Sequence, residues 1–105
     1  MDNDRETYKI IKNTAKELFP DCHILLFGSR ARLDYSDNSD YDFLIITKDT
    51  IDIQQKRFYK SQLRKILAKH KISADILIQS ESEIQLKKRI TGHIVREIIR
   101  EGISI

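Results

Sequence analysis

The sequence predicts a single α/β (α+β) domain in which helices pack on a β-sheet. Segments whose apolar residues recur at helical spacing alternate with short aliphatic runs that are typical of buried strands. The 105 residues, 40% of them hydrophobic, are enough for one core and leave no room for a second domain. No repeat, linker or low-complexity tract interrupts the pattern. We therefore expect one domain over residues 1–105, in the order helix, strand, helix, strand, helix, strand, helix.

The longer helices are marked by their apolar spacing and by their end signals. Pro20 ends the first helical pattern, because proline cannot continue a helix. The S-x-x-E sequence of Ser80 and Glu83 is a capping box that predicts the start of a later helix, and Gly92 divides that helix from a second stretch. Helices are predicted over residues 3–19 and 54–70, from residue 80 onward, and over residues 93–100, with Gly102 as a C-cap.

The strands are short aliphatic runs that end in turn formers. The first of them runs into Gly28-Ser29, after which residues 29–33 predict a short helical turn. The next seven residues, DYSDNSD, are rich in turn formers and predict a loop. Strands are predicted over residues 23–27, 41–47 and 73–79.

Charge and targeting signals narrow the class of protein. The 19 basic and 16 acidic side chains give a formal net charge of +3, which is too small to indicate nucleic-acid binding without a localised patch. The N-terminal residues lack the features of a signal peptide, and Cys22 has no second cysteine for an intramolecular disulfide. No apolar run approaches the roughly 20 residues of a membrane helix. We expect a cytoplasmic protein without a membrane span.

Three aspartates occupy positions where a strand would favour apolar residues. Asp40 and Asp42 stand two apart at the front of one predicted strand, so that both side chains point to one face, and Asp75 lies within the aliphatic run ADILI. Carboxylates on neighbouring strands would form an oxygen-rich site suited to Mg²⁺ with phosphate ligands. Taken alone, D-x-D is more often an acidic turn that enters a strand.

The Gly28-Ser29 turn is a candidate phosphate site. It lies between a buried strand and a helical turn, where backbone N–H groups and the Ser29 hydroxyl can bind phosphate, and glycine permits close approach to the backbone. By itself, a Gly-Ser pair after a strand is more often an ordinary turn.

These features occur together in the stretch GSRARLDYSDNSDYD, where ten residues separate Gly28-Ser29 from Asp40-Tyr41-Asp42. The stretch resembles the signature of the DNA polymerase beta-like nucleotidyltransferase superfamily, and Asp75 falls where that family carries its third carboxylate. The chain is most similar to the minimal nucleotidyltransferases that are encoded beside HEPN-domain proteins as toxin–antitoxin pairs. Such sequences often have glycine after GSRAR, where this chain has Leu33.

The resemblance implies a nucleotidyltransferase fold, a mixed β-sheet flanked by helices, and transfer of AMP from ATP to a hydroxyl. It implies that ATP binds as a magnesium complex, with metal-binding and catalytic carboxylates at Asp40, Asp42 and Asp75. Gly28 and Ser29 would bind the triphosphate. The implied partner is a HEPN toxin whose tyrosine is the acceptor, so that the protein acts as an antitoxin by protein adenylylation.

Two groups of basic residues each allow two interpretations. Arg30 follows the phosphate turn and is a candidate ligand for the triphosphate, and Arg32 is the weaker candidate because side chains two apart on a helical turn diverge. Either could instead lie on a solvated face. Between Gln54 and Ala74 there are seven lysines and arginines and no acid, which indicates a solvated face or a surface for an acidic partner or nucleic acid. No aromatic residues interleave with the basic ones on that face to stack bases, so nucleic acid is not expected as a direct partner.

We therefore predict a minimal nucleotidyltransferase that adenylylates a partner protein. Two other classes stay open: a catalytically silent module that neutralises its partner by contact, and an enzyme acting on an RNA end or a small molecule. The carboxylates and Ser29 argue against the first, and the lack of a second domain to hold a small substrate argues against the second. Assembly with itself or with another chain is left open.

Overall fold

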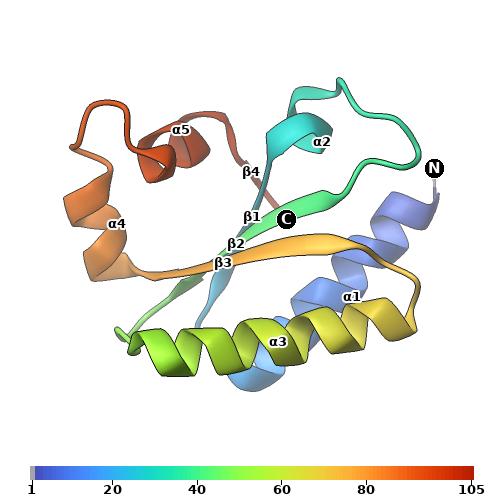
Figure 1. Cartoon of the computed structure of the whole chain (residues 1–105), viewed down its shortest axis with the longest axis horizontal. Coiled ribbons are helices and arrows are strands. Elements are labelled where there is room, and N and C mark those ends of the chain that lie inside the picture. The colour runs from blue at the N-terminus through green and yellow to red at the C-terminus, as the bar shows by residue number, and fades with distance from the viewer. Residues whose placement is uncertain (1) are drawn as a thin grey trace.

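A computed structural model describes residues 2–105 as one mixed β-sheet with helices on both faces (Figure 1). The sheet has four strands in the order β3-β2-β1-β4. Strand β1 pairs antiparallel with β2 and with β4, whereas β2 and β3 are parallel and are connected through a helix. The strands are β1 His23–Phe27, β2 Tyr41–Thr47, β3 Ala74–Ser80 and β4 Ile103–Ser104. The mixed sheet flanked by helices that we predicted is thus confirmed.

The helices divide between the two faces of the sheet. In Figure 1, α1 and α3 lie below the sheet and α2, α4 and α5 lie above it. The helices are α1 Asp2–Leu18, α2 Gly28–Arg32, α3 Ile53–Lys69, α4 Glu81–Lys87 and α5 Ile94–Glu101.

Two apolar clusters fill the spaces between the helices and the sheet. The larger cluster joins α1 and α3 to one face, and at its centre Phe43, Leu63 and Leu67 are fully buried. The smaller cluster joins Leu44 to Ile98 on the opposite face. Successive residues of β2 enter different clusters because strand side chains alternate between faces. Asp42 lies on the same face as Leu44, because side chains two apart in a strand share a face.

The last strand is an element that the sequence reading missed. Residues Ile103 and Ser104 pair with Leu26 and Leu25 of β1, and a two-residue strand is too short to show a period of two. Two of the apolar C-terminal residues are used in the fold: Ile98 is buried and Ile105 packs against the larger cluster. Within residues 2–105, no helix is both long enough and apolar enough to cross a membrane.

The predicted capping box is present at the start of α4. The Ser80 hydroxyl accepts from the Glu83 N–H at 3.1 Å, and Glu83 Oε1 accepts from the Ser80 N–H at 2.8 Å. Burial alone would raise the pKa of Glu83, but its bonds to Lys56 and to Ser80 prevail and lower it. The stability that Glu83 contributes is therefore present above its ordinary pKa and is lost as the pH falls through the lowered value.

Replacing Ser80 by alanine is expected to lower the free energy of unfolding by about 1–2 kcal/mol, because the cap is lost at a fully buried position. Urea unfolding of the variant measures this loss. Ser82→Ala is the control, since Ser82 is an exposed serine two residues after Ser80. Equal losses in both variants would contradict a specific capping role.

Candidate active site

Two of the predicted carboxylates are neighbours across the parallel strands. Asp42 of β2 is in register with Asp75 of β3, and on its other side it is in register with Phe27 at the end of β1. Residues in register on adjacent strands, roughly 4.8 Å apart, point to the same face. Asp40 precedes β2 by one residue. The fold therefore brings all three aspartates to one corner of the sheet.

Electrostatics confirm that these carboxylates act on one another. Burial raises the pKa of Asp42, and the charges of Asp75 and Asp40 raise it further, while Arg32 lowers it. Asp42 is half-buried, whereas Asp40 and Asp75 are exposed. Like charges that face each other in this way are stabilised by a cation between them.

Gly28 lies directly against Asp42. It has a φ of +75°, and a Cβ built on it would stand 2.2 Å from Asp42 Oδ2. Only glycine satisfies both conditions, since a side chain would be strained at this φ and would displace the carboxylate. Ser29 is the next residue of α2, the helix that begins where β1 ends. The strand–turn sequence thus places the backbone of Gly28 over the central carboxylate.

The carboxylates have the chemistry that a magnesium ion requires, but they are not gathered as a finished site. Asp75 Oδ1 accepts from Arg64 Nη2 at 2.9 Å, and its side chain is 70% exposed. Among the described residues, no three His, Cys, Asp or Glu side chains are arranged to hold one ion. Oxygen donors and the mutual repulsion at Asp42 nevertheless fit a hard divalent cation. The residues that would hold it are Asp42 and Asp75, with Asp40 beside them.

The structure assigns Arg30 a different role from the one predicted. The side chain is 7% exposed, and its guanidinium donates to Asp4 at 3.1 Å and to the Ser39 carbonyl at 2.9 and 3.2 Å. It also lies 3.9 Å from the ring centroid of Tyr41 and 4.5 Å from that of Tyr35. These contacts tie the 33–40 loop to α1.

This network is on the face of the sheet opposite to the carboxylates. Tyr41 and Asp42 are consecutive in β2 and so point in opposite directions. Because Arg30 stacks on Tyr41, its donors are used there and not at Asp42. The prediction that Arg30 binds the triphosphate is therefore not supported.

Arg32, the weaker candidate in the sequence, is the arginine whose charge acts on a predicted carboxylate, Asp42. Its charge lowers the pKa of Asp42. It is half-exposed and pairs with Asp34 at 3.3 Å and with Glu101 at 3.2 Å. The sequence reading missed Glu101, which lies 69 residues away, and also the contact of Arg64 with Asp75. No local sequence pattern predicts either ion pair.

Leu33, the departure from the family pattern, has a backbone conformation that glycine also favours. It has a φ of 64°, in the left-handed region that favours glycine, and its side chain is 79% exposed. The position that is often glycine in similar sequences is therefore one that requires a left-handed residue. Leu33 meets this requirement, and its backbone N–H donates to the carbonyls of Ser29 and Arg30.

The two arginines are expected to respond differently to substitution. Arg30→Gln should lower the free energy of unfolding by about 2–3 kcal/mol, because a buried charged network loses its centre. Arg32→Gln should change stability by less than about 0.5 kcal/mol, because its ion pairs are exposed. Chemical denaturation of both variants makes the comparison. A stable Arg30→Gln protein would contradict the structural role of Arg30.

A β-strand that runs into a glycine turn, set over carboxylates on two neighbouring strands, is the arrangement of a phosphate-transferring enzyme of the nucleotidyltransferase class. The chain belongs to the polymerase beta nucleotidyltransferase family, whose sequence model matches residues 9–105. It is a nucleotidyltransferase by this membership. The family predicted from the GSRAR and DYD motifs is thus confirmed.

Comparison with individual proteins agrees with this assignment. Over 82 residues the chain is 34% identical to a protein of Methanocaldococcus jannaschii that is named as a protein adenylyltransferase, covering 78% of this chain and 76% of that protein. A toxin–antitoxin complex solved with AMP-PNP contains a chain with a TM-score of 0.64 and 21% identity, covering 93% of this chain and 70% of that one. A complex of a tri-AMPylated HEPN toxin of Shewanella oneidensis with its MNT antitoxin gives a TM-score of 0.55 and 19% identity, covering 96% and 69%. At these identities the two structures show the shared fold.

Proposed function

We propose that this nucleotidyltransferase transfers AMP from magnesium-bound ATP to a hydroxyl of a partner protein in the cytoplasm. The partner is a HEPN-domain toxin, the acceptor is a tyrosine, and the modification makes this chain an antitoxin. The observation that carries the proposal is the register of Asp42 with Asp75, with the backbone of Gly28 against Asp42.

Each residue at this corner has a distinct task. Asp40 and Asp42 would hold the magnesium, which when bound would supply positive charge to offset that of the phosphates and of the leaving pyrophosphate. Asp75 completes the ligand set and orients the acceptor hydroxyl. Gly28 leaves room for the triphosphate beside Asp42, and the Ser29 hydroxyl can donate to it.

The relatives support a protein acceptor. The similar protein of M. jannaschii is named as a protein adenylyltransferase, and the S. oneidensis complex contains a HEPN toxin that carries AMP groups. An AMP group adds negative charge and bulk, which would repel RNA from the surface of a toxin. Modification and neutralisation are thereby linked in one step.

The experiment is incubation of this chain with Mg²⁺, ATP and the product of the neighbouring gene, which we expect to be the HEPN-domain protein, followed by intact-mass measurement. We expect the HEPN protein to gain whole multiples of AMP. Asp75→Asn should still form the complex but transfer AMP at least about a hundredfold more slowly, because it removes a positioned ligand of the reacting groups. Asp37→Asn, in the exposed loop, is the matched control.

Other outcomes would select one of the alternatives. Neutralisation of the toxin without any gain in mass would favour the catalytically silent module. Labelling of RNA ends or small alcohols, with the mass of the HEPN protein unchanged, would favour the enzyme with another acceptor. An Asp75→Asn protein that transfers AMP at the parental rate would contradict the role given to Asp75.

A further inference from the structure

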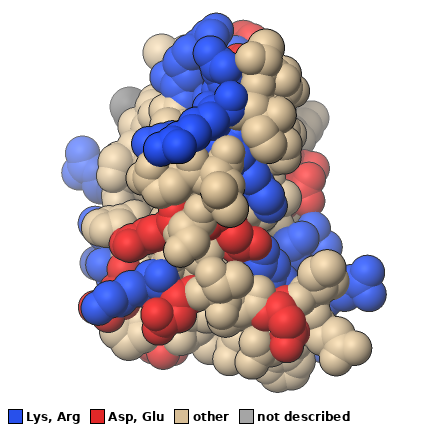
Figure 2. All heavy atoms as spheres, turned by 90° about the vertical axis from the view of Figure 1, so that its left-hand side faces the viewer, with Lys and Arg blue, Asp and Glu red and all other residues tan. Residues whose placement is uncertain are grey.

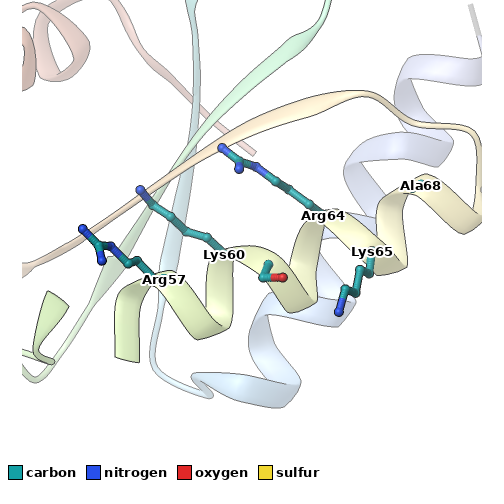
Figure 3. Close-up of a pocket in the computed structure, with 6 residues that line it drawn as sticks. Arg57, Lys60, Arg64, Lys65 and Ala68 are labelled. Atoms are coloured by element: carbon teal, nitrogen blue, oxygen red, sulfur yellow. The ribbon is translucent and has the colours of Figure 1, made fainter. Parts of the chain in front are cut away.

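Helix α3 carries a shallow groove on its outer side, with a volume of about 560 Å³. Its floor contains the small residues Ser61 and Ala68. Figure 3 shows the side chains of Arg57, Lys60 and Arg64 extending together toward β3, whereas Lys65 points away on the other side. The groove is therefore bordered by cations on both sides.

The helical period produces this arrangement. Leu63 and Leu67 bury one side of α3 against the sheet, and the groove residues occupy the solvent side. Positions 57 to 68 span about 16 Å along the helix axis, or three turns. Another helix or an extended segment of similar length could lie along this surface.

Most of these cations have no acidic partner in the fold. Lys56, on a different side of α3, pairs with Glu83, and Arg64 pairs with Asp75. Across the described side chains, no carboxylate lies within ion-pair distance of Arg57, Lys60 or Lys65. Their positive charge is therefore available to a partner.

Arg64 connects the groove to the candidate active site. It lines the groove and donates to Asp75 at 2.9 Å. Both side chains are more than half exposed, so this ion pair contributes little stability, and Arg64 can exchange Asp75 for another carboxylate at small cost. A segment bound at Arg64 would therefore lie near Asp75, where the proposed function requires the acceptor hydroxyl.

We propose that this basic groove is the docking surface for an acidic segment of the acceptor protein. Carboxylates of that segment pair with Arg57, Lys60 and Lys65, and the contact at Arg64 brings the acceptor to Asp75. The proposal rests on the proposed function for the identity of the partner. It extends that function by assigning the residues that select the acceptor.

The groove fits an acidic protein better than a nucleic acid. None of the residues that line it is aromatic, so no base could stack in it. On the face shown in Figure 2, acidic side chains are interspersed with basic ones, so the positive charge forms no continuous track for a phosphate backbone on that face.

The test is the charge-reversal variant Arg57→Glu/Lys60→Glu, with the adjacent-gene HEPN-domain protein as the probe. Surface plasmon resonance should show a Kd at least tenfold weaker, mainly through slower association, and a smaller dependence on salt. The control Lys9→Glu/Lys12→Glu has the same change in net charge on exposed positions of α1 and should bind like the parent. Calorimetry should show unchanged binding of magnesium-bound ATP in both variants.

The proposal would be overturned if the parent did not bind the HEPN protein, or if the groove variant bound it as tightly as the parent does. It would also be overturned if the groove variant lost only the binding of a 12-nucleotide single-stranded RNA. Failure of the proposed function is recognised separately. A parent protein that binds the HEPN protein through the groove but transfers no AMP would refute the transfer reaction while supporting the docking surface.

Discussion

Replacing Asp42 by asparagine is expected to abolish AMP transfer and, in the same protein, to raise the melting temperature at neutral pH. Asp42 is the central carboxylate, in register with Asp75 and in contact with Gly28. Transfer should fall more than a hundredfold, since loss of even an outer-shell partner of a metal costs about 10–100-fold. Asparagine has nearly the same shape, so the packing against Gly28 is kept.

The gain in stability follows from the raised pKa of Asp42, which burial and the charges of Asp75 and Asp40 cause. The folded state disfavours the ionised carboxylate, so ionisation at neutral pH reduces the free energy of unfolding. Below the ordinary pKa of aspartate the carboxyl is neutral in both states, and the advantage of the variant should disappear. Thermal melts from acid to neutral pH measure this difference.

Magnesium provides a second measurement on the same pair of proteins. Millimolar Mg²⁺ should raise the melting temperature of the parent and leave Asp42→Asn unchanged, because a ligand stabilises only the state that binds it. Asp49→Asn, exposed beyond the far end of β2, should behave like the parent throughout. An Asp42→Asn protein that is less stable at neutral pH, or that still responds to Mg²⁺, would contradict this account of the site.

Replacing Gly28 by alanine is expected to remove activity through geometry instead of charge. The new Cβ would stand 2.2 Å from Asp42 Oδ2, and the φ of +75° is strained for alanine. The strain costs about 1–2 kcal/mol of stability. Displacement of the carboxylate by about 1 Å is enough to reduce transfer roughly a hundredfold.

Gly92→Ala separates these two effects. Gly92 has a φ of +80°, but a Cβ at this position meets nothing within 4 Å. Its variant should lose a similar amount of stability in urea unfolding and keep the parental rate of AMP transfer. Equal loss of activity in both variants would show that backbone strain, and not contact with Asp42, explains the effect of Gly28→Ala.

The order of helices and strands could be predicted because it depends on local patterns. Pro20 after the first helix and the capping box of Ser80 with Glu83 act over a few residues, and the structure has every predicted helix and strand within a residue or two of the expected place. The aspartates were visible for a related reason. Asp42 and Asp75 are charged residues in aliphatic runs, where aspartate is rare, and this makes them conspicuous in a sequence.

The sequence by itself determined the family and the order of the elements before β4, and it predicted the three carboxylates, while the tertiary structure decided which basic residues contact them. The Arg30 side chain donates to Asp4, 26 residues away in the sequence, whereas the Arg64 side chain donates to Asp75. Strand β4 likewise exists only because β1 offers it a partner. The physical reason is the same in each case: the direction of a long charged side chain and the pairing of an edge strand depend on neighbours far away in the chain, which local periodicity does not encode.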